Sequence, residues 1–202
     1  MNEIMKYLYT LQNVTKKPVS LKTAEIFFKQ REYAWAIQEI KNVMQIPHKI
    51  KVVSKKDLNK PAHVLVPLIF IEGKNKLLDH VFIIEISNTI TLDFDVFVTT
   101  ISHELSHIYL YYHNYKDIKH IEKAVDVTAM ALGFSANFVR ARRNHSNLFP
   151  GLALRYGYLS DEEIEFVHDS IIKERKFKPK EKKSGSEQKK KGFFNLIREL
   201  FQ

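Results

Sequence analysis

The 202-residue chain has no cysteine, only six glycines and six prolines, and no long hydrophobic run. Without cysteine it can form no disulfide, thiolate zinc site, iron–sulfur cluster or cysteine nucleophile. Its longest apolar stretch, residues 64–71, is interrupted by Pro67, whereas a membrane-spanning helix needs about 20 apolar residues. The N-terminus lacks a basic patch followed by an apolar run, so it predicts no signal peptide. We therefore expect a cytoplasmic protein.

The positive charge is concentrated near the C-terminus. Of the net charge of +9, residues 173–202 carry +7, from 11 Lys and Arg and 4 Asp and Glu, so residues 1–172 are almost balanced. A domain that binds nucleic acid is basic over its own surface. We therefore expect the body of this chain not to bind nucleic acid.

The C-terminal tail divides into two segments of different composition. Residues 177–191 are mainly Lys, Glu, Ser, Gly and Gln, which predicts a flexible basic linker. Residues 192–202 predict a short amphipathic helix, because apolar side chains recur at helical spacing: Phe193, Leu196, Ile197 and Leu200. We expect residues 189–202, which begin with three lysines, to contact an anionic membrane surface or a protein partner. The protein would then be membrane-associated.

Residues 1–176 predict one α+β domain, with a helical N-terminal part at residues 1–46. From periodicity and breaker residues, helices are expected at residues 2–12, 20–45, 93–112, 118–132, 135–143 and 160–176, and strands at 49–54, 63–71 and 80–87. The last two strands are expected to form a hairpin. Asp93 or Thr91 can cap the helix at residues 93–112, Gly133 suits a helix end, and Ser160 with Glu163 forms a capping box.

The sequence His103-Glu-Leu-Ser-His107 lies in the middle of the predicted helix at 93–112. A helical turn takes about 3.6 residues, so the two imidazoles share one face. Neutral imidazoles are good zinc ligands, with Zn–N distances of about 2.0–2.1 Å. Glu104 is rotated about 100° from His103, where it can act as general base on a zinc-bound water without being a ligand. The motif thus supplies two ligands and one base.

A catalytic zinc site needs a third protein ligand and an open position for water. Glu122 and Asp126 stand four residues apart on the next predicted helix and share a face. Glu122 can complete the ligand set, and Asp126 can accept the free ring N–H of a ligating histidine. The surrounding residues are almost all apolar, and a carboxylate buried there is costly unless paired or metal-bound.

These two motifs together resemble the zincin metallopeptidases, and specifically their gluzincin branch. Residues 122–129, Glu-Lys-Ala-Val-Asp-Val-Thr-Ala, also resemble the Glu-x-x-Ala-Asp/Asn-x-x-Ala pattern of ImmA/IrrE-type proteases of bacteria and mobile elements. The resemblance covers about residues 80–135. It implies a zincin-like domain with a small mixed sheet, in which residues 80–87 form an edge strand beside the active-site helix. An extended peptide could pair with that strand by β-augmentation.

Other residues are alternatives or additions to this site. His113 follows His107 by six residues, as the third histidine of metzincins does, but the glycine that those proteins need midway is Leu110 here. Glu122 is therefore favoured as the third ligand, and His113 stays open as the alternative. His145, Tyr156 and Tyr158 are candidate oxyanion stabilisers.

The leading interpretation is a zinc metallopeptidase, a hydrolase with one Zn²⁺ that cleaves a peptide bond of a protein or peptide substrate, with Glu104 as general base. The alternative is a catalytically inactive zincin-like binding module, in which the zinc is structural and the basic amphipathic tail tethers the module to a membrane or partner. The sequence does not identify the substrate.

Overall fold

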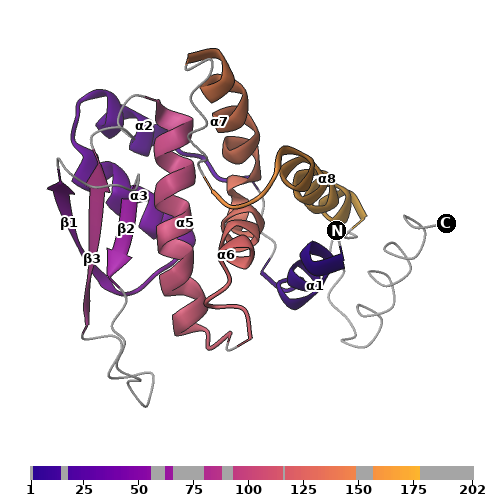
Figure 1. Ribbon diagram of the computed structural model, residues 1–202. Coiled ribbons are helices and arrows are strands. Elements are labelled where there is room, and N and C mark those ends of the chain that lie inside the picture. The colour runs from indigo at the N-terminus through magenta and orange to yellow at the C-terminus, as the bar shows by residue number, and fades with distance from the viewer. Residues whose placement is uncertain are drawn as a thin grey trace.

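The computed structural model describes residues 2–14, 18–55, 62–65, 80–87, 93–115, 117–148 and 157–177. The domain is α+β, and a three-stranded mixed sheet lies at one side of it, with α5 beside the sheet and the helices α6, α7, α1 and α8 beyond (Figure 1). The elements are α1 (Asn2–Thr10), α2 (Lys22–Lys29), α3 (Tyr33–Met44), β1 (Lys49–Lys55), β2 (Ala62–Leu65), β3 (Val81–Ser87), α5 (Phe94–Tyr112), α6 (Glu122–Ala129), the π-helical turn η2 (Met130–Phe134), α7 (Ser135–Leu148) and α8 (Asp161–Phe177).

The sheet has the strand order β1-β3-β2, with β1 parallel and β2 antiparallel to β3. The antiparallel pairing of the second and third predicted strands is confirmed. The expectation that residues 80–87 form the edge strand beside the active-site helix is wrong, because β3 is central and β2 takes that place. The apolar residues of β3 explain this position: Phe82, Ile84 and Ile86 are buried on one face, and Ile83 is half-buried on the other. Residues 66–71 of the predicted strand lie outside the described residues.

The single helix expected at residues 20–45 is also wrong. The chain turns sharply between α2 and α3, and Arg31 there has a φ of 62°. A non-glycine residue in this left-handed region costs about 1–2 kcal/mol. The turn allows Phe28 to pack against both Tyr33 of α3 and Phe97 of α5, with ring centroids 5.7 and 5.0 Å apart. Aromatic burial of this kind offsets the strain.

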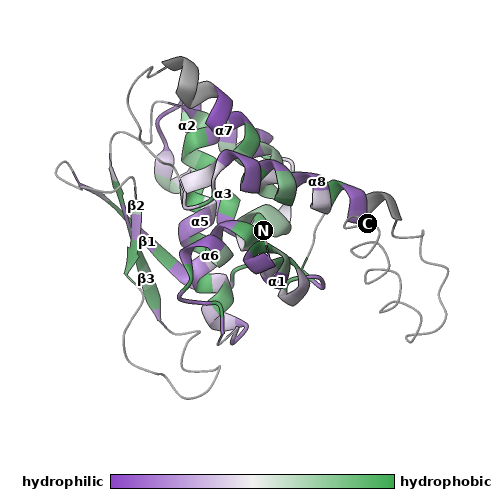
Figure 2. Cartoon of the chain, turned by 45° about the vertical axis from the view of Figure 1, so that its right-hand side comes forward, coloured by the Kyte–Doolittle hydropathy of each residue, from purple (hydrophilic) through white to green (hydrophobic). Residues whose placement is uncertain are grey.

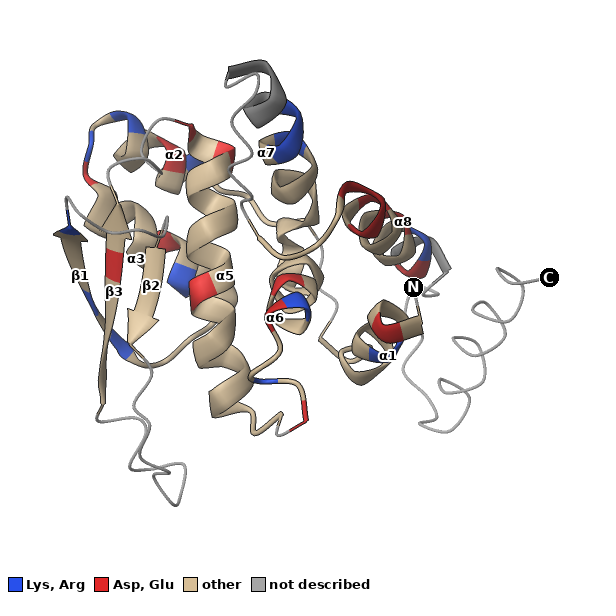
Figure 3. Ribbon diagram, viewed as in Figure 1, with Lys and Arg blue, Asp and Glu red and all other residues tan. Residues whose placement is uncertain are grey.

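Helix α5 is the central helix of the domain and lies between β2 and the pair α6 and α7. It begins where predicted, because the Asp93 side chain accepts a hydrogen bond from the Val96 N–H at 2.9 Å. Hydrophobic residues run along β3 and along the helix surfaces that face one another (Figure 2). The charged residues of α5 are two acids, Asp95 and Glu104, whereas α8 begins with a cluster of acids (Figure 3).

Helix boundaries further along the chain differ from those predicted by up to five residues: α6 ends at Ala129 rather than at residue 132, and α7 extends to Leu148 rather than to residue 143. Helix α6 begins at Glu122 rather than at residue 118, and Gly133 has a φ of 121° in the turn that joins α6 to α7. The capping box of α8 is confirmed: the Ser160 N–H donates to Glu163 Oε2 at 2.8 Å, and the Glu163 N–H donates to Ser160 Oγ at 3.2 Å. The predicted linker and amphipathic segment lie outside the described residues, apart from Phe177.

None of the helices in the described part of the chain combines the length and hydropathy that a bilayer span requires.

Candidate metal centre

Two histidines of α5 form the first half of the centre. His103 and His107 lie one turn apart on the helix, and their ring centroids are 5.0 Å apart with an interplanar angle of 83°. His103 is buried and His107 is half-buried. The 19-residue helix is buried over most of its length, so the backbone that carries the two imidazoles is fixed by packing rather than by the motif itself.

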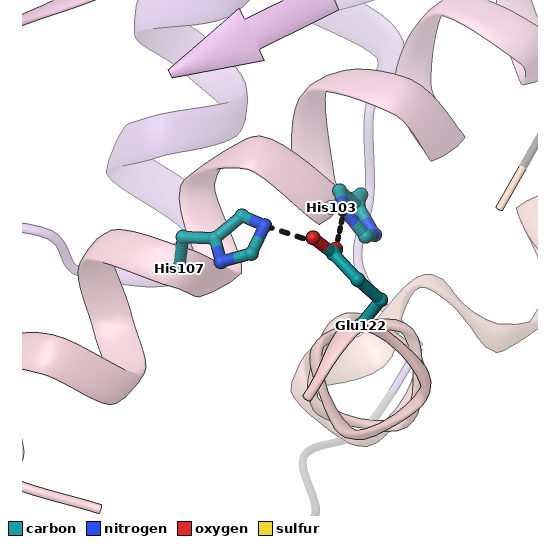
Figure 4. A group of neighbouring side chains, drawn as sticks. All are labelled: His103, His107 and Glu122. Carbon is teal, nitrogen blue, oxygen red and sulfur yellow. Dashed lines mark ion pairs between the residues drawn. The ribbon is translucent and has the colours of Figure 1, made fainter. Parts of the chain in front are cut away.

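Helix α6 brings a carboxylate to these rings. Glu122 is the first residue of α6, where the helix dipole favours a negative charge. Its Oε2 lies 3.2 Å from His103 Nε2 and 3.4 Å from His107 Nε2, and Figure 4 shows the carboxylate pointing between the two rings. All three ligand atoms lie within 4.8 Å of one another, so the group could hold one metal ion.

The Glu122 oxygen at the middle of this group is buried, yet no described residue forms a hydrogen bond with it. The two Nε2 atoms therefore approach it at ion-pair distance without hydrogen-bond geometry. A buried carboxylate oxygen without a hydrogen bond lowers the free energy of unfolding. Three donor atoms that face a common point without bonding to one another fit the chemistry of a cation with His, His and Glu ligands.

Asp126, one turn after Glu122, fixes the orientation of His103. Its side chain is fully buried, and its Oδ1 lies 2.7 Å from His103 Nδ1. Its Oδ2 accepts hydrogen bonds from the backbone N–H groups of Tyr158, at 2.6 Å, and Leu159, at 3.2 Å. Since a carboxylate only accepts, the proton of a neutral His103 lies on Nδ1, and Nε2 is left free to bind a metal ion.

The charges around His103 favour its protonated form when no metal is bound. Burial lowers the pKa of His103, but the charge of Asp126, the contacts with Asp126 and Glu122 and the charge of Glu104 outweigh burial and raise this pKa to about 10. The approach of His103, and next that of His107, holds the pKa of the Glu122 carboxyl well below its usual range, although burial opposes this. A site that attracts a proton so strongly also attracts a cation.

Glu104 is buried beside the ligand group without belonging to it. Its Oε2 accepts a hydrogen bond of 2.8 Å from the backbone N–H of Val64 in β2. The carboxylate thus joins α5 to the edge strand. A second acid next to a possible cation can accept a proton from a water molecule there.

The other candidate residues fall into three groups. His113 ends α5, is exposed and packs its ring 4.3 Å from that of Tyr109, so the structure brings Glu122 and not His113 to the two imidazoles. Tyr158 stacks on His103, with centroids 5.6 Å apart and planes 23° apart. Burial, followed by the charge of Glu122, raises the pKa of Tyr158. Tyr156 and the side chain of His145 lie outside the described residues.

Two residues that complete the surroundings of the site are absent from the sequence prediction. Val64 contributes through its backbone N–H, and a backbone group leaves no mark in a residue pattern. Gly157, with a φ of 94°, lies against Asp126. A lone glycine between two tyrosines indicates a turn, but it does not indicate a partner 31 positions away.

The described residues therefore support a metal site of the His-Glu-x-x-His type with a glutamate as third ligand. Compared with models of known protein families, with curated proteins and with solved structures, the chain gave no match.

Proposed function

We propose that the protein is a zinc metallopeptidase of the zincin type. The observation that carries the proposal is the convergence of His103 Nε2, His107 Nε2 and a Glu122 oxygen within 4.8 Å, next to a buried acid, Glu104, that is not a ligand. Two imidazoles and one carboxylate, with a position left for water, form a typical catalytic zinc site. Structural zinc sites instead use four protein ligands.

Zinc bound by these residues would lower the pKa of its water towards about 7 and polarise a substrate carbonyl. The protein side chains would transfer the protons and orient the groups. Glu104 accepts the proton of the attacking water and returns it to the leaving amine nitrogen as the peptide C–N bond breaks. Asp126 would hold His103 in one orientation throughout, and Tyr158, whose ring stacks on His103, would donate to a developing oxyanion.

A protein or peptide substrate is supported by the position of β2. This strand lies at the edge of the described sheet, and its Val64 N–H points away from β3 towards Glu104. An extended peptide that pairs with this edge of β2, where the Val64 N–H is bonded to Glu104, would place its backbone beside the ligand group. The substrate would thus pair with β2 and not with residues 80–87, the strand expected from the sequence.

Replacement of Glu104 by Gln tests the proposal. Gln retains an oxygen that can accept the Val64 N–H, so the fold and zinc content should be unchanged, while peptide cleavage falls by about 10²–10⁴-fold with loss of the base. Metal content is measured on protein purified without chelators, and cleavage on an unstructured protein substrate. Wild-type protein that contains no zinc, and binds none on titration, contradicts the proposal.

A binding module with a structural zinc is the second candidate. It is favoured by the Glu104–Val64 hydrogen bond, which gives Glu104 a structural role that needs no catalysis. Equal activity of wild type and Glu104→Gln in cells would support this candidate.

A further inference from the structure

The segment before α8 surrounds the Asp126 carboxylate with hydrogen-bond donors. We define the Asp126 clamp as residues 157–159. The N–H groups of Tyr158 and Leu159 both donate to Asp126 Oδ2, while His103 Nδ1 lies on the other oxygen. Three donors thus meet two acceptor oxygens. An asparagine could accept from both N–H groups through its Oδ1, but its NH₂ group would then face His103 Nδ1, so only a carboxylate accepts from all three donors.

Gly157 allows the clamp to approach this closely. A Cβ atom on Gly157 would lie 2.9 Å from Asp126 Oδ2 and 3.2 Å from Oδ1. Its φ of 94° is also one that L-residues rarely adopt. The carboxylate has no room to retreat, because it is fully buried and its other side is bonded to His103. A side chain at position 157 would therefore displace either the clamp or the carboxylate.

The clamp is anchored to the helices on both sides, independently of any metal ion. Lys123, the residue after Glu122, forms an ion pair with Glu163 of α8 at 2.6 Å. Arg142 of α7 donates to the Leu159 carbonyl at 3.2 Å and pairs with Asp161. The Tyr158 ring is stacked on His103. The same three residues thus contact Asp126 through their backbone and His103 through a side chain.

We propose that Gly157 is a positioning residue of the metal centre: by admitting the clamp, it fixes Asp126 and through it the orientation of His103 that leaves Nε2 free for the metal ion. This inference rests on the proposed metal centre and deepens it. Removing a residue that hydrogen-bonds to a metal-ligating histidine lowers metal affinity by about 10–100-fold. The three atoms nearest to a Cβ at position 157 all belong to the Asp126 carboxylate, so Gly157 would act on the centre through Asp126.

The test is a double-mutant cycle on the full chain, comprising wild type, Gly157→Ala, Asp126→Ala and the double variant. Zn²⁺ affinity is measured by competition with a chromophoric chelator. Gly157→Ala should bind Zn²⁺ about 10–100-fold more weakly than wild type. In the absence of the carboxylate the added methyl meets no oxygen, so Asp126→Ala and the double variant should have equal affinities.

A second measurement separates positioning from general loss of structure. ¹⁵N NMR of the metal-free protein should show His103 with its Nδ1 protonated and hydrogen-bonded in wild type, and this signature should be lost in Gly157→Ala. The φ strain of an alanine at position 157 is common to both backgrounds, whereas the clash with the carboxylate is not. Gly157→Ala should therefore lower the free energy of unfolding more in wild type than in the Asp126→Ala background.

The possible failures are distinct. Wild type that binds no Zn²⁺ overturns the metal centre and the inference together. Wild type that binds Zn²⁺ while Gly157→Ala binds it equally well overturns only the role of Gly157. The same holds if Gly157→Ala weakens binding as much in the Asp126→Ala background as in wild type, or if it lowers the free energy of unfolding equally in both backgrounds.

Discussion

The backbone N–H of Val64 donates a 2.8 Å hydrogen bond to the Glu104 carboxylate. The proposed general base is therefore held by the edge strand β2, with which a peptide substrate would pair, as well as by its own helix. This contact connects the sheet to the metal centre, and it can be broken without altering any side chain of the centre.

Val64→Pro removes this N–H donor. Proline is tolerated at an edge position whose N–H does not bond within the sheet, and the Val64 N–H points to Glu104. We expect unchanged Zn²⁺ affinity, stability lower by about 1–3 kcal/mol because a buried carboxylate loses a donor, and slower peptide cleavage. Ala62→Pro, two residues earlier on the same edge, is the matched control. Equal cleavage by the two variants would show that Val64 does not position Glu104.

Zinc uptake should release a proton from His103. The raised pKa of about 10 keeps His103 protonated near pH 8 in the metal-free protein, and a ligating imidazole must lose the proton on Nε2. Affinity should therefore fall by about tenfold per pH unit as pH is lowered, for each proton displaced. Isothermal titration in buffers of different ionisation enthalpy measures the release. Asp126→Asn, which removes the main anionic partner, should release fewer protons, and buffer-independent heats would contradict the prediction.

His48 should make stability sensitive to acid. It is fully buried between the rings of Phe82 and Tyr112, and neither ring nitrogen has a hydrogen-bond partner among the described residues. Burial, followed by the charges of His80 and Lys41, lowers its pKa below the ordinary 6.5. The unfolded chain thus binds a proton below pH 6.5 that the folded chain does not. The contribution of neutral His48 to the free energy of unfolding is fully present above pH 6.5 and is lost as the pH falls below 6.5.

Urea unfolding of the metal-free protein between pH 7.5 and 5, at about half-unit steps, tests this role of His48. His48→Phe removes the ionisable group and retains an aromatic ring, so its stability advantage over wild type should grow as pH falls. His120→Asn, at an exposed histidine, should follow the wild-type curve. A constant difference between His48→Phe and wild type across this range would exclude His48 as the cause.

The basic tail is expected to bind anionic membranes. Removal of residues 178–202, which keeps α8 complete, should abolish co-sedimentation with phosphatidylserine vesicles. Binding of the full chain should weaken with salt, because each lysine near the surface contributes about 1 kcal/mol of screened attraction. Phosphatidylcholine vesicles provide the neutral control. Co-sedimentation that is unchanged by the truncation would show that the tail is not the membrane contact.

Local chemistry explains which features could be predicted from the sequence. The facing of His103 and His107 follows from helical geometry alone, and the caps at Asp93 and Ser160 follow from side chains that bond within three residues. Glu122 was predictable as a ligand candidate because an acid in an apolar helix needs a partner. Its approach to the imidazoles, by contrast, depends on how α5 and α6 pack.

The errors and omissions arise from contacts between distant segments. The turn at Arg31 carries no glycine or proline, and only the packing of Phe28 on α5 compensates for it. Strand order depends on pairing across the sheet, which residue alternation within one strand does not specify. The clamp around Asp126 consists of backbone groups, and its one sequence mark is the glycine that makes room for it.

The ligand group draws its members from α5 and α6, two helices that an unfolded chain would not hold together. A cation that binds them would bind the folded state alone, and at a hundredfold excess over its dissociation constant it would add about 2.7 kcal/mol to the free energy of unfolding. Supply of the ion would then govern how long the molecule resists unfolding and proteolysis, so metal starvation would reduce its abundance as well as its activity.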